Sequence, residues 1–390
     1  MIICPKCKSS DFRKYGMINR VVMTFSGKKT KSVQRYQCHN GHLFRALNGG
    51  SDWDDAFIET VVYTYLQCLS LNTTITIIRM FYRDDILSKS VVLMMIEWVA
   101  DALPTLDDID GLFYPVRSGY FALDGVWFQY GKEQIVLLVC FDPENFDVIV
   151  AHWAEQETQK EYELLITDTV NKIGITNVKG IYGDGDNGLL EAKKHLLPNT
   201  PFQTCVFHKE LHMGQIVPVK SVRISKKLTA FQKHDIKSFQ WLFRETIYAS
   251  TKEEAYEAFD RLKEYAQSSA HQYPEKFMKA YRSLAHNFKY TLTHFDHPHM
   301  RRDNNLLECF NGCIKPRLRL MRGFKRKENL DRYLKLFLMA FRFHPLKESR
   351  FDERRGKSPL EVSGVLLPKY YNFLSFLRTK LRLSYQPKST

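Results

Sequence analysis

The sequence predicts an α/β protein whose mixed β-sheet follows a helical region and is interrupted by a helical insertion. Three observations support this fold class. Apolar residues recur at helical spacing over residues 52–104, and from residue 118 the pattern changes to short segments rich in aromatic and β-branched residues, typical of strands. Residues 213–298 are then polar and helical in pattern, without a strand signal.

The composition is that of a globular protein with a polyanionic partner. With 390 residues, 44% of them hydrophobic, the chain is long enough for two or three domains. The formal charge is +14, and His299–Lys357 alone holds 17 Lys and Arg against 7 Asp and Glu. Such a concentration favours nucleic acid as the partner, although a solvated helix face is the simpler explanation of a charge run.

No secretory signal or membrane span is expected, because no stretch approaches the roughly 18 apolar residues that a span needs. The eight cysteines are therefore expected to be metal ligands or buried thiols rather than disulfides. We expect a cytoplasmic, nucleoid-associated protein of a prokaryote without a membrane partner.

The first 48 residues have the ligand spacing of a zinc ribbon. One knuckle is the Cys-Pro-Lys-Cys segment, and a less regular second knuckle follows a short β segment. The four expected ligands of Zn²⁺ are Cys4, Cys7, Cys38 and His42. They would hold the ion tetrahedrally and stabilise a segment with little core of its own. His39 is an alternative to His42, and free thiols are the alternative to a metal site.

Residues 49–112 are expected to form a helical DNA-binding region. Two periodic runs flank the turn Leu69–Asn72, the second from Thr73 to Phe81, in the manner of a helix-turn-helix. Ser88-Lys-Ser90 is a capping signal for a third helix, Val91–Trp98. Three amphipathic helices that only pack against one another are the alternative.

Residues 113–212 alternate between strand and helix patterns. Strands are expected at 120–130, 134–141, 148–153, 178–182 and 202–207, and helices at 158–173 and 188–197. The order β-β-β-α-β-α-β-α is that of the ribonuclease H-like fold, in which the first and fourth strands lie side by side in the middle of the sheet. That adjacency brings Asp124, in the first strand, close to Asp184, directly after the fourth.

The rest of the chain is expected to add a helical insertion, to complete the sheet domain and to end in a tail. The expected segments are the insertion at 213–298, the last part of the core with basic DNA-binding helices at 299–365, and the tail at 366–390. A helix over 306–314 should end or kink at Pro316, which lacks a backbone donor. A further helix is expected at 329–343.

Three acidic residues, Asp124, Asp184 and Glu308, stand in recognisable local contexts. Brought together on a mixed sheet, three carboxylates make a site for a hard divalent cation that keeps positions free for phosphate and water. Each has an alternative explanation. Asp124 fits an exposed strand edge, Asp186 competes with Asp184, and Asn305-Leu-Leu-Glu308 fits an N-capping box.

At these residues the chain resembles the mutator-like group of DDE transposases, over about residues 115–365. The matching motifs are Leu123-Asp-Gly125, Gly183-Asp-Gly-x-x-Gly-Leu189, Cys205-Val-Phe-His208, Asn304-Asn-Leu-Leu-Glu-Cys-Phe-Asn311, Arg322-Gly-Phe324 and Gly356-Lys-Ser-Pro-Leu-Glu361. The resemblance implies catalysis by the three acids: hydrolysis at the ends of a mobile element, then attack of the freed 3′-hydroxyl on target DNA.

The resemblance further implies two Mg²⁺ or Mn²⁺ ions, bridged by Asp124, with Asp184 on one ion and Glu308 on the other. Double-stranded DNA, as element ends and target, is the expected partner, and joining two ends implies a homodimer or higher oligomer. The alternatives are a domesticated derivative that acts as a DNA-binding regulator, and another ribonuclease H-like nuclease such as a resolvase.

Other residues near the acids have less specific expectations. Cys205 and His208 are spaced for a zinc knuckle, but we expect them to pack or hydrogen-bond beside the site because no second pair lies nearby. Cys309 and Cys313 lie one helical turn apart, which suits metal binding, but we expect buried thiols because these are commoner on a helix. Basic residues close to Glu308 are candidate phosphate contacts, which position DNA without reading its sequence. These are Lys315, Arg317, Arg319, Arg322, Lys325, Arg326 and Lys327.

Overall fold

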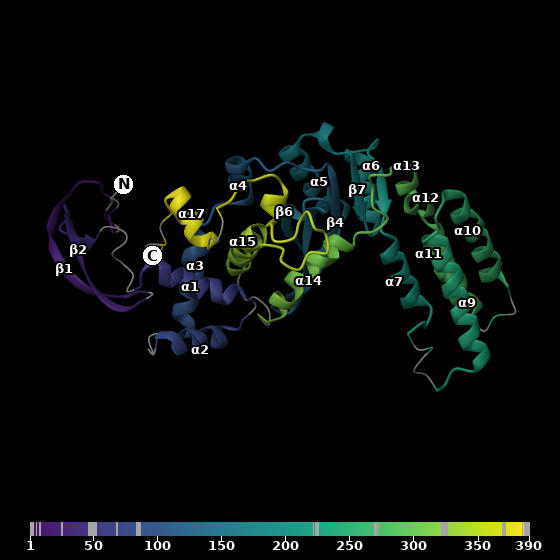
Figure 1. Ribbon diagram of the computed structural model, residues 1–390, viewed down its shortest axis with the longest axis horizontal. Coiled ribbons are helices and arrows are strands. Elements are labelled where there is room, and N and C mark those ends of the chain that lie inside the picture. Colours follow the sequence, from purple (N-terminus) through teal and green to yellow (C-terminus); the bar gives the residue numbers. More distant parts are fainter. Residues whose placement is uncertain are drawn as a thin grey trace. The chain divides into compact units, whose positions relative to one another are not determined.

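The chain forms two compact units, and the predicted α/β class with a mixed sheet is confirmed (Figure 1). The computed structural model describes residues 4, 6–7, 9–24, 26–45, 53–67, 69–82, 87–220, 222, 226–268, 271, 273–320, 327–368, 372–383 and 385, with the backbone alone at 45, 319 and 320. The helical unit comprises Met1–Pro115, Gln129–Glu133 and Ile314–Thr390. The sheet unit comprises Val116–Phe128 and Gln134–Cys313.

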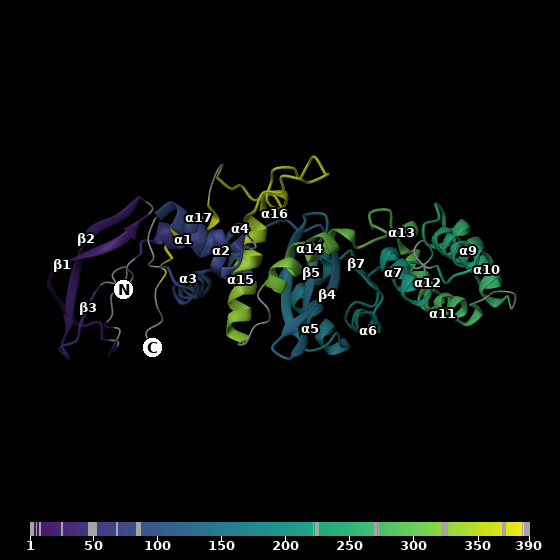
Figure 2. The same ribbon diagram turned by 90° about the horizontal axis from the view of Figure 1, so that it is seen from below.

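A long antiparallel hairpin opens the helical unit (Figure 2). β1 (Phe12–Thr24) pairs with β2 (Gly27–Cys38), and the short β3 (Leu43–Arg45) pairs with β2. The prediction of a short β segment underestimated its length, since the two strands have 13 and 12 residues. The reason is physical: most of the hairpin is exposed on both faces, so the sequence carries no period-two apolar signal.

Four helices follow the hairpin. They are α1 (Asp55–Leu66), α2 (Leu71–Tyr82), α3 (Lys89–Ala102) and α4 (Leu106–Phe113). The expected cap of the third helix is confirmed, because the Ser88 side chain accepts the backbone N–H of Val91. The sequence interpretation missed α4, although Thr105 and Asp108 form the capping box that begins it.

The carboxy-terminal helices share one hydrophobic core with α1 and α3. These are α15 (Lys327–Phe343), α16 (Pro359–Val362) and α17 (Phe373–Leu381). Residues 366–390, expected to be a tail, thus include a helix whose Leu374 and Leu377 are buried, while 386–390 lie outside the described residues. Arg378 of α17 also donates to the buried carboxylate of Glu59 in α1, at 2.6 Å.

α14 (Asn305–Leu320) runs through Pro316 and passes from the sheet unit to the helical unit at Ile314. Of the two expectations at Pro316, an end or a kink, the end is wrong because the helix continues to Leu320. Gly312, four residues earlier, is exposed and has no side chain, so its carbonyl can tilt towards solvent beside the proline ring.

The sheet unit is built on a five-stranded sheet in the order β6-β5-β4-β7-β8. The strands are β4 (Tyr120–Tyr130), β5 (Glu133–Asp142), β6 (Asp147–Ala154), β7 (Gly180–Gly183) and β8 (Phe202–Thr204). β5 and β6 are antiparallel, whereas β7 is parallel to both β4 and β8. The expected central adjacency of the first and fourth strands is present. The last strand ends three residues before its expected end, because α7 (Val206–Ile216) begins there.

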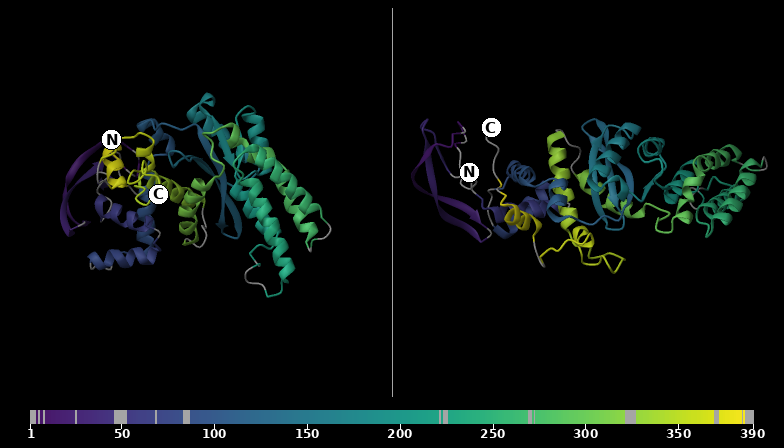
Figure 3. Two further views of the ribbon diagram at one scale, coloured as in Figure 1. Left: turned by 45° about the vertical axis from the view of Figure 1, so that its right-hand side comes forward. Right: turned by 90° about the horizontal axis from the view of Figure 1, so that it is seen from above.

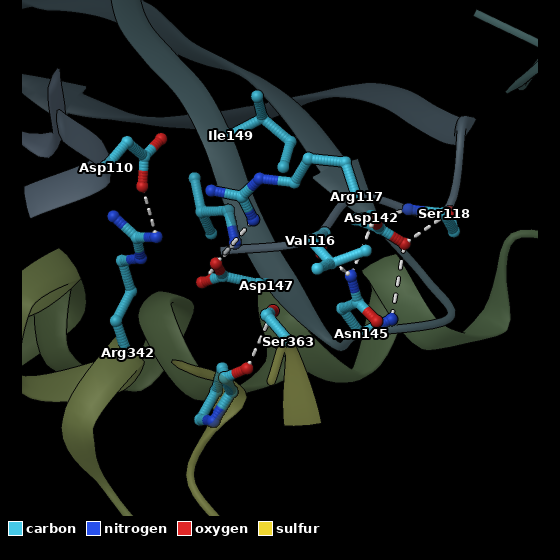
Figure 4. A network of polar contacts seen from close by, with 12 residues as sticks. Asp110, Val116, Arg117, Ser118, Asp142, Asn145, Asp147, Ile149, Arg342 and Ser363 are labelled. Carbon is cyan, nitrogen blue, oxygen red and sulfur yellow. Dashed lines mark hydrogen bonds and ion pairs between the residues drawn. The ribbon is translucent and has the colours of Figure 1, made fainter. Parts of the chain in front are cut away.

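A buried carboxylate fixes the start of β4 (Figure 4). Asp142, at the end of β5, accepts the backbone N–H of Ser118 at 2.8 Å and its hydroxyl at 2.7 Å. It also accepts the backbone N–H groups of Glu144 and Asn145 in the turn before β6. These bonds satisfy a carboxylate that has no exposed surface, and they set the register at which the strand carrying Asp124 begins.

Helices α5 (Gln159–Ile173) and α6 (Asn187–Leu196) supply the apolar side chains that cover the sheet. The insertion contains α9 (Ala230–Ile247), α10 (Lys252–Gln267), α11 (Pro274–Ala285), α12 (Phe288–Thr291) and α13 (Thr293–Asp296). Its three long helices lie side by side around their own core (Figure 3), where the rings of Phe239 and Phe277 stack at 4.5 Å.

The end of the insertion is anchored to the sheet by Gln203 of β8. The fully buried Gln203 amide donates to the Thr291 carbonyl at 3.0 Å and accepts the His294 backbone N–H at 2.8 Å. The chain therefore returns to the sheet beside β8, a few residues before α14 begins. Glu308 thus returns to the acids of β4 and β7 although it is 124 positions beyond Asp184.

Candidate active site

The sheet order brings Asp124, Asp184 and Glu308 to one place. Asp124 lies in β4 and is 8% exposed, Asp184 follows β7 directly, and Glu308 lies in the first turn of α14. One ligand atom each from Asp124, His208 and Glu308 lie within 4.8 Å of one another. Asp184 is outside this closest group, but its charge acts on Asp124.

Two hydrogen bonds hold the Asp124 carboxylate in the sheet. One oxygen accepts the backbone N–H of Gly125 at 2.9 Å, and the other accepts the side-chain amide of Asn311 at 3.0 Å. Asn311 is 1% exposed and lies three residues after Glu308 on α14, so both side chains project from neighbouring positions of one helix. The sequence interpretation quoted Asn311 within a motif but did not predict this contact.

The electrostatics of the site favour binding of a cation. Burial, the charge of Asp184 and the charge of Glu308 together raise the pKa of Asp124 well above its ordinary value. Burial also raises the pKa of Asp184, against the hydrogen bond that its carboxylate accepts from the Asp186 backbone. Carboxylates gathered in a buried place repel one another, and a divalent cation bound between them would remove that cost.

The Cys205-x-x-His208 motif connects α7 to the start of α14. His208 Nε2 lies 3.1 Å from Glu308 Oε1, and the Cys205 sulfur accepts the backbone N–H of Asn304 at 3.2 Å. Burial opposes the charged imidazole, but contacts with Cys205 and Glu308 raise the pKa of His208 to about 11. Both residues thus form hydrogen bonds beside the acids. The group of possible metal ligands around Asp124 includes His208 but not Cys205.

The geometry also bears on the alternatives for the second and third acids. The Asp186 side chain caps α6 by accepting the backbone N–H of Gly188 at 2.7 Å, which leaves Asp184 as the acid that faces the cluster. An N-capping box would direct the backbone N–H of Asn305 to Glu308. That N–H donates instead to Asp303, at 3.1 Å.

Two further charged residues lie near the acids without having been singled out in the sequence. Glu157 precedes α5 and accepts hydrogen bonds from the indole of Trp127 and the hydroxyl of Tyr162. Burial, and then the charge of Asp184, raise the pKa of Glu157. Lys209 follows His208 in α7, and burial lowers its pKa against the attraction of Asp184. No strand or motif signal marks either residue, because only the packing of α5 and α7 brings them here.

Comparison with known families decides the identity of the chain. The model of the Mutator family of transposases matches residues 8–344. The chain belongs to the Mutator family of transposases. This match confirms the predicted resemblance, and a transposase of this family binds DNA and acts on it. A search of curated proteins gave no match. Among the helices that the structure describes, none is both long and apolar enough to cross a membrane.

The amino-terminal region of this Mutator-family transposase holds a second metal-ligand group. The ligand atoms of Cys4, Cys7, Cys38 and His42 lie within 4.8 Å of one another. The alternative ligand His39 instead contacts the Ser9 hydroxyl at 3.2 Å. The Ser9 backbone N–H and the His42 side chain lower the pKa of Cys7 to about 6, which favours the thiolate that a metal needs. Three sulfurs and one nitrogen fit Zn²⁺.

The candidate phosphate contacts of the transposase fall partly within the described residues. Lys315 and Arg317 are half-buried on α14, with the Arg317 guanidinium 5.0 Å from the centre of the Phe337 ring, and Lys327 is exposed at the start of α15. The side chain of Arg319 and the residues Arg322, Lys325 and Arg326 lie outside the described part.

The expectation of buried thiols on α14 is wrong. Cys309 and Cys313 are both exposed, whereas the helix buries the neighbouring residues Phe310 and Ile314, whose side chains point about 100° away.

Proposed function

We propose that this transposase cuts DNA at the ends of a mobile element and joins the freed 3′ ends to target DNA. In this proposal Asp124, Asp184 and Glu308 hold two Mg²⁺ or Mn²⁺ ions, with Asp124 as the bridging ligand. The observation that carries the proposal is the burial of Asp124 between two other carboxylates, which raises its pKa and which a cation would offset.

The donor set fits hard divalent ions, since carboxylate oxygens are the ligands that Mg²⁺ prefers. When bound, two such ions would activate the attacking oxygen and stabilise the leaving oxygen. The chain's own residues do the positioning. Asn311 and Gly125 hold the Asp124 carboxylate, and His208 holds one oxygen of Glu308. The protein supplies no covalent nucleophile, because phosphoryl transfer depends mainly on alignment and charge neutralisation.

Two reactions follow at this site. In hydrolysis, a water oxygen bonds to phosphorus as the P–O3′ bond breaks, and the departing O3′ gains a proton while the water loses one. In strand transfer, the freed 3′-hydroxyl attacks a target phosphorus and displaces a target O3′ in the same manner. Hydrolysis converts one phosphodiester into a 5′-phosphate and a 3′-hydroxyl, and strand transfer exchanges one phosphodiester for another. Both displace an O3′ from phosphorus, so one site can serve both.

DNA recognition falls to the amino-terminal region in this proposal. The exposed face of α2 presents Asn72, Thr73 and Thr76, whose side chains can bond to base edges and phosphates in a major groove. The zinc ribbon and the basic residues of α14 and α15 would add phosphate contacts. Two element ends must be joined, so we propose a homodimer or higher oligomer.

The test is cleavage and joining of DNA by the purified full-length protein with Mg²⁺ or Mn²⁺. The substrate is a duplex carrying the DNA that flanks the gene, where terminal inverted repeats and a short target duplication are expected. The wild type should cleave and join, Asp124→Asn should do neither, and the exposed Asp168→Asn should match the wild type. Activity that survives Asp124→Asn would overturn the site assignment. DNA binding without cleavage in the wild type would favour a regulator instead.

A further inference from the structure

Lys209 brings a positive charge to the acidic cluster from a different direction than His208. The two residues are consecutive on α7, and successive side chains of an α-helix point about 100° apart. His208 reaches Glu308 at 3.1 Å. Lys209 reaches the loop after β7 instead, where a Cβ added to Gly185 would lie 3.5 Å from its ammonium nitrogen. The ammonium therefore lies beside the loop that follows Asp184, whose charge acts on it.

Among the described residues, no contact explains the position of this ammonium. Lys209 is half-buried, and its backbone N–H donates to the Cys205 carbonyl, yet its ammonium makes no hydrogen bond or close ion pair with any residue that the structure describes. Two other lysines of the sheet unit with restricted exposure have hydrogen-bond partners instead. The ammonium of Lys172 donates to the Ile149 carbonyl at 2.7 Å, and that of Lys193 donates to the Pro198 carbonyl at 3.0 Å. If Lys209 only neutralised Asp184, its ammonium would be expected to form a direct ion pair with that carboxylate, since an unpaired buried charge is costly.

We propose that the Lys209 ammonium contacts a non-bridging oxygen of the scissile phosphate, beside Asp184, and stabilises the charge on that oxygen in the transition state. The inference rests on the proposed function and adds a catalytic residue to its site. Phosphoryl transfer spreads negative charge over the non-bridging oxygens, and lysine serves as a compact point charge for phosphate. No proton or bond changes place at Lys209. It remains an ammonium throughout both steps.

The test pairs a change in the protein with a change in the DNA. A methylphosphonate at the scissile position replaces one charged non-bridging oxygen by a methyl group. Wild type, Lys209→Met and Lys209→Arg are compared on the phosphodiester and on each methylphosphonate diastereomer. The matched control is Lys194→Met, whose lysine lies on α6 of the same unit and pairs with the exposed Glu191 at 2.7 Å.

Lys209→Met should cleave the phosphodiester about 10²-fold more slowly, the usual effect of removing one group that stabilises transition-state charge. In Lys209→Met, the factor by which one methylphosphonate diastereomer slows cleavage should shrink by a similar amount. Lys209→Arg should keep part of the cleavage rate, and Lys194→Met should stay within about twofold of the wild type. A second readout avoids catalysis. With Ca²⁺ in place of Mg²⁺, Lys209→Met should weaken binding of the phosphodiester duplex more than binding of that methylphosphonate duplex.

The proposal would be overturned if the rate losses caused by Lys209→Met and by the methylphosphonate simply multiplied, with no coupling between them. Unchanged cleavage by Lys209→Met would also overturn it, as would tighter Mn²⁺ binding by this variant together with full methylphosphonate sensitivity, because Lys209 would then only neutralise Asp184. These failures leave the proposed function intact if Asp124→Asn is inactive. Loss of cleavage in the wild type, or its survival in Asp124→Asn, overturns the proposed function as well.

Discussion

Replacing Asp124 by Asn is expected to stabilise the metal-free transposase while removing its response to Mg²⁺. The substitution deletes a charge without changing the shape of the side chain. The oxygen that accepts the Gly125 N–H is kept. On the other side, Asn311 now donates to the carboxylate, and its own amide oxygen is buried with no hydrogen-bond partner among the described residues. Turning that amide over would let it accept a hydrogen bond from the new amide.

The magnitude follows from the spacing of the charges. The ligand atoms of Asp124 and Glu308 lie within 4.8 Å of each other, and Asp184 adds a third negative charge. Two unit charges at that separation repel by about 3 kcal/mol at an effective dielectric constant of about 20. The nearby His208 offsets part of this repulsion. We expect a gain of about 1–3 kcal/mol, with each kcal/mol raising Tm by about 2–4 °C for a unit of 150–250 residues.

The gain should depend on pH in a defined direction. Burial raises the pKa of Asp124 in the folded protein above its unfolded value of about 4. A group of this kind favours folding below the unfolded pKa and loses that contribution as the pH rises towards the folded pKa. The difference between Asp124→Asn and the wild type should therefore be small near about pH 4 and grow towards about pH 8.

Thermal unfolding in EDTA at these two pH values measures the effect, and titration with Mg²⁺ measures the metal response. The exposed Asp168→Asn, on α5 of the same unit, controls for loss of a carboxylate and should change stability by about 0.5 kcal/mol or less. A variant that is less stable than the wild type near about pH 8, or one that keeps the full Mg²⁺ shift, would refute the electrostatic reasoning.

Three other outcomes are expected. Cys38→Ser should lose the bound zinc and the structure of the hairpin, whereas His39→Ala should keep both, as elemental analysis and far-ultraviolet circular dichroism would show. Leu377→Ala should cost about 2–5 kcal/mol in urea unfolding, because this α17 side chain is fully buried; a loss under about 1 kcal/mol would mean that the helix does not belong to the core. Lys315→Ala and Lys327→Ala should each reduce the salt dependence of DNA binding by about one phosphate contact, and an unchanged slope would remove that residue from the interface.

Periodicity in the sequence predicted most of the elements that carry the site, since apolar spacing reports which face of an element is buried. The strands around Asp124 and Asp184, with helices α5 and α6, lie within a few residues of their expected bounds. The length of the hairpin was underestimated because most of it is exposed on both faces. The continuation of α14 through Pro316 was not predicted either. The packing of α17 into the core was not predicted, since the pattern of a short amphipathic helix does not indicate which core it packs against.

The sequence by itself predicted three candidate acids, the strand order that pairs Asp124 with Asp184, and the candidate ligands of the amino-terminal metal group. The strand order follows from local patterns and the ligand types from side-chain chemistry, whereas Glu308 was chosen chiefly from the family resemblance. Only the tertiary structure decided what surrounds the acids: Asn311 on Asp124, His208 on Glu308, and Lys209 beside Asp184. Such contacts join residues about 100 or more positions apart in two of the three cases. They depend on how α7 and α14 pack on the sheet, which no local spacing records.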